Sequence, residues 1–163
     1  MRIGIISDTH GHIANSLAAV RLLEQFDDIK AVLHCGDIGT IEIPPLFAAW
    51  PTHFVFGNCD YDEDALREAI RKVPGHVCHE RKGSLELADR RIGLIHSDDR
   101  WTFLEMARCN RFDLVCYGHT HIAKEERVGR TLVLNPGALY RATPHTLALV
   151  DLVTMTTERL TCV

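Results

Sequence analysis

Side chains that can bind metal ions occur at five places in this chain, and each place follows an apolar run. The first is Asp8-Thr9-His10, which follows the apolar run 3–6 after one serine. The last is His119-Thr120-His121, which repeats the two-residue spacing after the run 114–117. A carboxylate beside an imidazole suits a first-row divalent metal such as manganese, iron or zinc. Asp8-Thr9-His10 alone fits a polar turn after a strand equally well, because short motifs often match by chance. The complete set is Asp8, His10, Asp37, Asn58, His96, His119 and His121.

This set contains enough oxygen and nitrogen ligands for two metal ions that share one carboxylate. Two ions roughly 3.5–4 Å apart form the usual clamp for displacement at phosphorus, and they lower the pKa of a water between them toward about 7. Asn58 would be a neutral oxygen ligand, which limits the negative charge of the site and favours an anionic substrate. The residue types therefore indicate hydrolysis of a phosphate ester.

Strand ends must bring these residues together. If the extended backbone of the first strand continues to His10, the side chains of Asp8 and His10 project to the same side. Gly11 then allows a sharp turn. In open α/β sheets, sites form at the carboxyl ends of the strands, so we expect the other polar strand ends to converge there too.

The hydrophobic pattern predicts alternating strands and helices in the first half of the chain and mainly strands in the second half. Asp62 is expected to cap the third helix, and Asp98 or Asp99 the fourth. The predicted helices are 13–26, 44–50, 62–73 and 98 or 99 to 109. The predicted strands are 3–6, 31–35, 54–56, 85–88, 92–95, 114–117, 131–134, 146–152 and 156–161. With no linker or repeat in the sequence, we expect stacked α/β layers in a single domain, residues 1–163.

Composition narrows the classes of function. A formal net charge of −4 argues against a nucleic-acid surface, which should be basic. The sequence has no signal peptide and no apolar segment of transmembrane length, so we expect a cytoplasmic protein that does not bind membranes. Six cysteines occur without a C-x-x-C pair, which favours reduced thiols over a zinc knuckle or a redox motif.

Five motifs in order resemble the calcineurin-like metallophosphoesterases, in particular the compact single-domain phosphodiesterases of bacteria and archaea. The motifs are Asp8-Thr9-His10, Gly36-Asp37, Gly57-Asn58-Cys59-Asp60, His96-Ser97-Asp98 and Gly118-His119-Thr120-His121. Asn135-Pro136-Gly137 resembles the closing loop of the family. The resemblance therefore extends over nearly the whole chain.

The resemblance implies a four-layer αββα sandwich, with the late strands forming the second sheet, and it implies a role for each motif residue. Asp8, His10 and His121 would hold one metal ion, and Asn58, His96 and His119 the other. Asp37 would bridge the two ions. Asp37, Asn58 and His96 are expected to carry the reaction, an in-line attack of a metal-bridging hydroxide on phosphorus. Manganese is the expected metal, with iron, zinc or nickel as alternatives.

The chain departs from the family pattern at two positions. Cys59 stands where many members have a histidine that protonates the leaving group, although the compact branch often has cysteine there. Asp98 stands where the compact branch usually has a second histidine near the substrate. We expect Cys59 and Asp98 to contact the substrate, but Asp98 suits a helix cap equally well. His12 is a further candidate for substrate contact, with an exposed turn residue as the alternative.

Two other functions compete with a phosphodiesterase for small phosphate esters. One is a non-catalytic scaffold, because a retromer subunit resembles this fold and has an altered metal site; the complete ligand set argues against it. The other is a nuclease, which the acidic balance disfavours. A homo-oligomer is compatible with the sequence.

Overall fold

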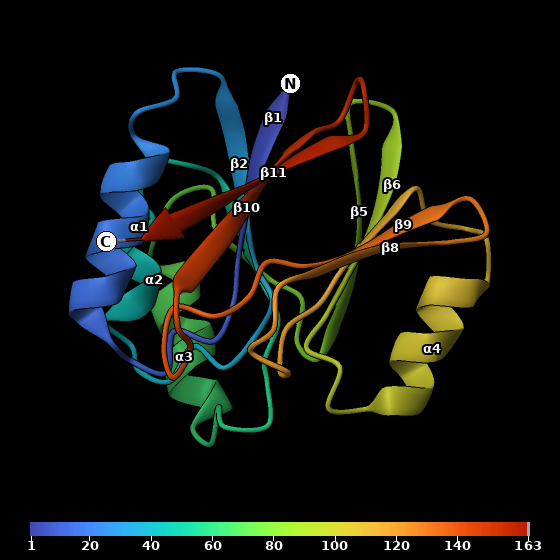
Figure 1. Cartoon of the computed structure of the whole chain (residues 1–163). Helices are drawn as coiled ribbons and strands as arrows, with labels where there is room; N and C mark the ends of the chain where they lie inside the picture. Colours follow the sequence, from blue (N-terminus) through green and yellow to red (C-terminus); the bar gives the residue numbers. More distant parts are fainter. Residues whose placement is uncertain (163) are drawn as a thin grey trace.

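The computed structural model describes residues 1–162 and contains two β-sheets that face each other (Figure 1). The strands of the first sheet are β1 (Arg2–Ile6), β2 (Ile29–His34), β3 (Thr52–Phe54), β4 (Val77–Cys78), β10 (His145–Asp151) and β11 (Thr156–Cys162). The strands of the second are β5 (Lys82–Leu87), β6 (Arg90–Ile95), β7 (Leu114–Cys116), β8 (Lys124–Val128) and β9 (Thr131–Asn135). The strand orders are β11-β10-β1-β2-β3-β4 and β5-β6-β7-β9-β8.

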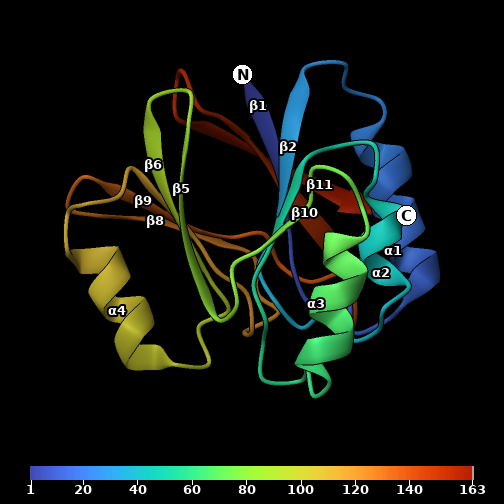
Figure 2. The ribbon, with the colours of Figure 1, turned by 180° about the vertical axis from the view of Figure 1, so that it is seen from behind.

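Helices cover the outer faces of both sheets. Helices α1 (Ile13–Leu23), α2 (Ile43–Leu46) and α3 (Glu63–Arg71) lie on the outer side of the first sheet, and α4 (Arg100–Arg108) lies on the outer side of the second (Figures 1 and 2). The layer order is therefore helices, sheet, sheet, helix. This is the expected αββα sandwich.

Alternation along the strands separates the core into three layers, because successive side chains of a strand point to opposite faces. In β1, Ile3 and Ile5 pack between the two sheets, whereas Ile6 packs against the helices. In β7, Leu114 packs between the sheets and Val115 packs toward α4. Both sheets are thus buried on both faces, which explains why their central strands are nearly continuous apolar runs.

Three helices begin at capping residues that the sequence places before them. Asp62 accepts a hydrogen bond from the backbone N–H of Ala65, which confirms the predicted cap of α3. Asp99 caps α4 by accepting from the N–H of Thr102. His12 caps α1 through its ring nitrogen, which accepts from the N–H of Asn15.

The structure corrects several predicted boundaries. The first helix ends at residue 23 and not 26, the second covers only residues 43–46, and the third strand lies at residues 52–54. The short strand β4 and the charged strand β8 were missed because neither has an alternating apolar pattern. The predicted late strands 146–152 and 156–161 belong to the first sheet, where β10 pairs antiparallel with β1, so they do not form the second sheet.

None of the helices within residues 1–162 is both long enough and apolar enough to cross a lipid bilayer.

Candidate metal centre

The predicted ligands follow the carboxyl ends of strands from both sheets. Asp8 and His10 follow β1, and Asp37 follows β2, its parallel neighbour in the first sheet. His96 follows β6 and His119 follows β7, a parallel pair in the second sheet. Parallel neighbouring strands have their carboxyl ends at the same edge of a sheet, so the ligands of each sheet lie at one edge. These two edges lie side by side, since Asp37 of the first sheet and His96 of the second are in contact.

The Asp37 carboxylate lies between imidazoles from the two sheets. Its Oδ2 atom is 3.4 Å from Nε2 of His10 and 3.3 Å from Nε2 of His96. Its Oδ1 atom accepts a hydrogen bond of 2.8 Å from the backbone N–H of Cys59. One carboxylate oxygen therefore faces a nitrogen ligand on each side, which is the arrangement that a bridging ligand requires.

Asp8 forms a second group with His10 and His121. Its Oδ1 atom lies 3.1 Å from Nε2 of His121 and 3.9 Å from Nε2 of His10. The Nε2 atoms of the two histidines are 3.4 Å apart. The structure thus brings together one potential ligand atom from each of these three residues within 4.8 Å, and likewise from Asp8, Asp37 and His96.

Backbone carbonyls orient two of the imidazole rings. Nδ1 of His96 donates to the carbonyl of Cys35 at 2.8 Å, and Nδ1 of His121 donates to the carbonyl of Arg141 at 3.3 Å. A carbonyl can only accept, so in each ring Nδ1 carries a proton and Nε2 is the atom left for a metal. This is how metal-binding histidines are usually held.

Two buried polar atoms in the cluster lack a hydrogen-bond partner among the described residues, namely Oδ1 of Asp8 and Nε2 of His96. The neighbouring imidazole and carboxylate approach them closely, but not with hydrogen-bond geometry. A buried acceptor without a partner is costly in free energy. Bound divalent cations would satisfy these atoms, and the mixed nitrogen and oxygen donors fit a first-row metal.

Burial and neighbouring groups together shift the pKa values of the cluster. It raises the pKa of the Asp8 carboxyl and lowers the pKa of the His10 imidazole. Burial also raises the pKa of Asp37, but the His96 ring, the Cys59 N–H and His10 outweigh it, so this pKa lies below its usual range. A bound cation would favour the charged form of both carboxylates.

The backbone at most of these ligands is left-handed, so the condition that the extended strand continues to His10 is not met. Strand β1 ends at Ile6, and the side chains converge through successive turns. Backbone hydrogen bonds hold these turns, from the N–H of Asp8 to the carbonyl of Gly36 and from the N–H of His10 to the carbonyl of Asp37. The residues with positive φ are Asp8 (55°), His10 (44°), Asp37 (53°), His119 (71°) and His121 (57°).

The two remaining predicted ligands, Asn58 and His119, are exposed at the rim of the cluster. The ring of His119 meets that of His96 edge-on, with centroids 5.1 Å apart, and its backbone N–H donates to Oδ2 of Asp8 at 3.1 Å. The side-chain amide of Asn58 donates to Sγ of Cys59 at 3.4 Å. Their loops therefore contact the cluster, while their side chains lie outside its buried part.

Cys59 lies within the cluster, because its Sγ atom is within 4.8 Å of potential ligand atoms of His10 and Asp37. Burial, followed by the charge of Asp37, raises the pKa of its thiol above the usual value. A thiol with a raised pKa stays protonated at neutral pH, so this environment disfavours a thiolate nucleophile.

His12 and Asp98 flank the cluster. The His12 ring stacks on the Tyr140 ring with centroids 5.2 Å apart, in addition to capping α1. Asp98 does not cap α4, a role that Asp99 takes, so the alternative of a helix cap is wrong for Asp98. Its Oδ2 atom lies 3.8 Å from Nη1 of Arg81, a side chain that also donates to the carbonyl of Gly57 at 3.1 Å.

Sequence reasoning missed several residues that support the ligand loops. Asp60 accepts hydrogen bonds of 2.8 Å from the N–H groups of Gly57 and Gly39, which tie two loops together. Asn135 donates to the carbonyl of Gly118 at 2.9 Å. Tyr140 also approaches the His10 ring, with centroids 5.7 Å apart. The one available signal was the position of Asp60 two residues after Asn58, where an aspartate commonly bonds to turn N–H groups.

Comparisons with known proteins identify the family of this chain. Residues 1–155 match the calcineurin-like phosphoesterase superfamily domain. The chain is 31% identical to a phosphodiesterase of Methanocaldococcus jannaschii over 140 residues, which cover 84% of this chain and 83% of the relative.

Solved structures show the same fold. The structure of an archaeal phosphodiesterase has a TM-score of 0.91 with 26% identity, and the similarity covers 99% of both chains. Vps29 of Chaetomium thermophilum has a TM-score of 0.70 with 15% identity, covering 98% of this chain and 95% of that one, so this likeness concerns the fold alone. Together with the matched domain and the phosphodiesterase relative, these findings show that the chain belongs to the calcineurin-like phosphoesterase superfamily.

Proposed function

We propose that this metal-dependent phosphoesterase hydrolyses phosphodiesters with two divalent metal ions at the strand-end cluster. The observation that carries the proposal is the position of Asp37 Oδ2, which lies 3.4 Å from His10 and 3.3 Å from His96. Because the site takes ligands from both sheets, residues 1–163 act as a single domain in this proposal.

The proposed ligand sets follow the two groups around Asp37. Asp8, His10 and His121 hold one ion, and Asn58, His96 and His119 hold the other. Two such ions, when bound, supply a water of lowered pKa and neutralise charge on the phosphoryl oxygens. Asp37 contacts both ligand groups and so holds them next to each other. Its pKa lies below the usual range, so its carboxylate is charged at neutral pH.

The chain's own residues also position the ester. Asn58 offers a neutral oxygen at the exposed rim, so this residue adds no negative charge where a phosphate group approaches. His12, Cys59 and Asp98 lie around that rim and are the proposed substrate contacts. The buried His96, anchored to Cys35, stays in place while the substrate enters and leaves.

Manganese is the proposed metal, since the ligands combine imidazoles with hard carboxylate and amide oxygens. Iron, zinc and nickel suit the same donor types.

The six cysteines are free, which supports a reducing compartment such as the cytoplasm. We propose small phosphate esters as substrates, with no membrane partner and with nucleic acid disfavoured by the net charge of −4; the chain can also act as a homo-oligomer.

A non-catalytic scaffold of the same fold is the competing function. Vps29 neighbours with 15% identity share the architecture only. The retained ligand set favours the enzyme.

Purified protein loaded with manganese should bind two ions per chain and hydrolyse bis(4-nitrophenyl) phosphate. Metal analysis after dialysis and release of 4-nitrophenolate measure the two properties. The control is manganese at the same concentration without protein. Fully loaded protein with no activity above this blank would contradict the enzymatic function and favour the scaffold.

Asp37→Ala should lose more metal than His10→Ala, because Asp37 contacts both ligand groups and His10 only one. Metal-to-protein ratios after dialysis test this difference. Asp28→Ala removes an exposed carboxylate that pairs with Arg2, so it serves as the control and should retain the wild-type ratio. Equal ratios for the Asp37 and His10 variants would mean that Asp37 does not bridge.

Asp98→His should raise the ratio of monoesterase to diesterase activity while metal content stays unchanged. A carboxylate at the rim repels a dianionic monoester more strongly than a monoanionic diester, and the substitution removes this repulsion. Both activities are measured with 4-nitrophenyl esters. The matched control is Asp99→Ala, which should lower the free energy of unfolding by about 0.5–2 kcal/mol through loss of the helix cap and leave the ratio unchanged. An unchanged ratio in Asp98→His would show that Asp98 does not face the substrate.

A further inference from the structure

A groove of about 620 Å³ lies on the α4 side of the second sheet and begins at the candidate metal centre. At one end it is lined by Ser97, Asp98, His119 and Thr120, which belong to two of the loops that carry proposed metal ligands. His119 itself is one of those ligands. His119 thus belongs to both the groove and the proposed metal centre, so a substrate whose phosphate lies at the metals can extend toward the groove.

The middle of the groove is aromatic and aliphatic. The rings of Phe103 and Tyr117 pack with centroids 4.5 Å apart, and both residues line the groove. Leu104 lies beside them on α4, and Ile122 lines the groove with 68% of its surface exposed. Large exposed apolar side chains beside a polar site are typical of ligand-binding grooves.

The charges of the groove are balanced. Its lining contains two acidic and two basic side chains, namely Asp98, Glu126, Arg100 and Lys124. Lys124 pairs with Glu126 at 2.7 Å, and Asp98 lies 3.8 Å from Arg81. The groove therefore has no excess of positive charge that could bind a second phosphate or the backbone of a polynucleotide. It is better suited to an uncharged group.

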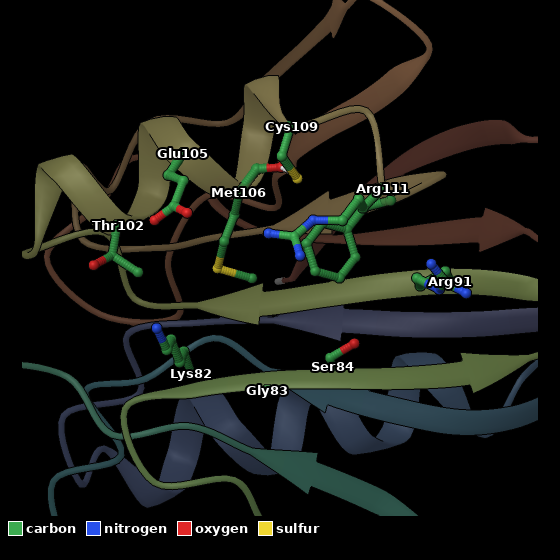
Figure 3. Close-up of a pocket in the computed structure, with 10 residues that line it drawn as sticks. Lys82, Gly83, Ser84, Arg91, Thr102, Glu105, Met106, Cys109 and Arg111 are labelled. Carbon is green, nitrogen blue, oxygen red and sulfur yellow. Dashed lines mark hydrogen bonds between the residues drawn. The ribbon is translucent and has the colours of Figure 1, made fainter.

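A second cavity, of about 460 Å³, lies between α4 and the β5–β6 hairpin and has a different character (Figure 3). Its lining includes Lys82, Arg91 and Arg111 with Glu105 as the one acidic side chain. It contains none of the proposed metal ligands. This cavity is therefore separate from the phosphoester site and serves as an internal control for binding.

We infer that the groove lined by Phe103, Leu104, Tyr117 and Ile122 binds an aromatic, uncharged substituent of the phosphodiester. This inference rests on the proposed function and names its substrate class: diesters with at least one flat aromatic group. The aromatic floor supplies stacking and apolar contact, while the adjacent metal centre takes the phosphate.

Kinetics of two variants test the inference. Leu104→Ala and Ile122→Ala should each lower kcat/KM for bis(4-nitrophenyl) phosphate by about 3- to 10-fold, because each removes apolar contact with the aromatic group. Ile41→Ala is the matched control: Ile41 is also exposed, at 49%, but it does not line this groove, so its kcat/KM should stay at the wild-type value. Wild-type kcat/KM in both groove variants would overturn the inference.

A second substrate, methyl 4-nitrophenyl phosphate, identifies the substituent that enters the groove. If the leaving group binds there, the variants lose activity toward both esters. If the retained substituent binds there, they lose activity toward the bis-aryl ester alone. Either pattern supports the groove as a substrate subsite.

Binding without reaction separates this inference from the proposed function. Diphenylphosphinate and dimethylphosphinate are monoanions that resemble diesters but have P–C bonds, which hydrolysis does not cleave. In methyl-labelled, zinc-loaded protein, diphenylphosphinate should shift the Leu104 and Ile122 resonances, and dimethylphosphinate should leave them in place. The Thr102 methyl, which lines the second cavity and not the groove, is the internal control and should not move.

Unshifted Leu104 and Ile122 resonances, or equal shifts with both phosphinates, would refute the aromatic subsite even in an active enzyme. Selective shifts in a protein that hydrolyses neither ester would keep the subsite and refute the phosphodiesterase function instead.

Discussion

The candidate site depends on how closely the Asp37 carboxylate is enclosed by the loops around it. Its Oδ2 atom faces imidazoles from both sheets, and its Oδ1 atom is held by the N–H of Cys59. A Cβ atom at position 57 would lie 2.1 Å from that Oδ1 atom, so only glycine allows the third ligand loop to pass. Gly118 likewise allows a ligand loop to pass close to Asp8, because a Cβ atom at position 118 would lie 2.7 Å from Oδ2 of Asp8. The glycines beside the ligands are thus needed for close packing of the loops, and the sheets can meet at a common edge because of them.

This packing is maintained against unfavourable backbone conformations. Five proposed ligands have positive φ, between 44° for His10 and 71° for His119. Each such residue costs on the order of 1 kcal/mol or more when it is not glycine. Hydrogen bonds between the loops after β1 and β2, together with the buried layer between the sheets, hold these conformations. Strained residues that persist in a well-packed structure often mark functional sites. Here the strain turns successive side chains toward one point, where a cation can compensate by binding them.

Local patterns in the sequence predicted stacked α/β layers and the convergence of polar strand ends, whereas the four-layer αββα order was predicted from the resemblance to the family. Apolar runs ending in a glycine and a polar residue, as at Gly36-Asp37 and Gly118-His119, indicate strand ends, and parallel strands place these ends at one edge. The left-handed turns could not be predicted, since they depend on hydrogen bonds between loops far apart in sequence. The sheet to which β10 and β11 belong was also beyond local reasoning, because a continuous apolar run such as that of β10 would suit either sheet. The charged strand β8 is stabilised by its pairing with β9. Its own sequence has no alternating apolar pattern from which a strand could be predicted. The groove is assembled from residues 97–126, and its continuity with the metal centre exists only in the folded chain.

Two features of the site point to the same kind of substrate. The residue after Asn58 is Cys59, whose thiol has a raised pKa and is a weak proton donor at neutral pH. Without a strong general acid, hydrolysis is fastest when the leaving group is stable as an anion. A phenolic oxygen, with a pKa near 10, leaves far more readily than an alkoxide and needs little help from an acid. An aromatic groove next to a metal centre would select such leaving groups by contact as well as by reactivity. Cys59 and the apolar lining from Phe103 to Ile122 are therefore consistent with one another, since each would favour aryl esters as substrates of the proposed phosphodiesterase.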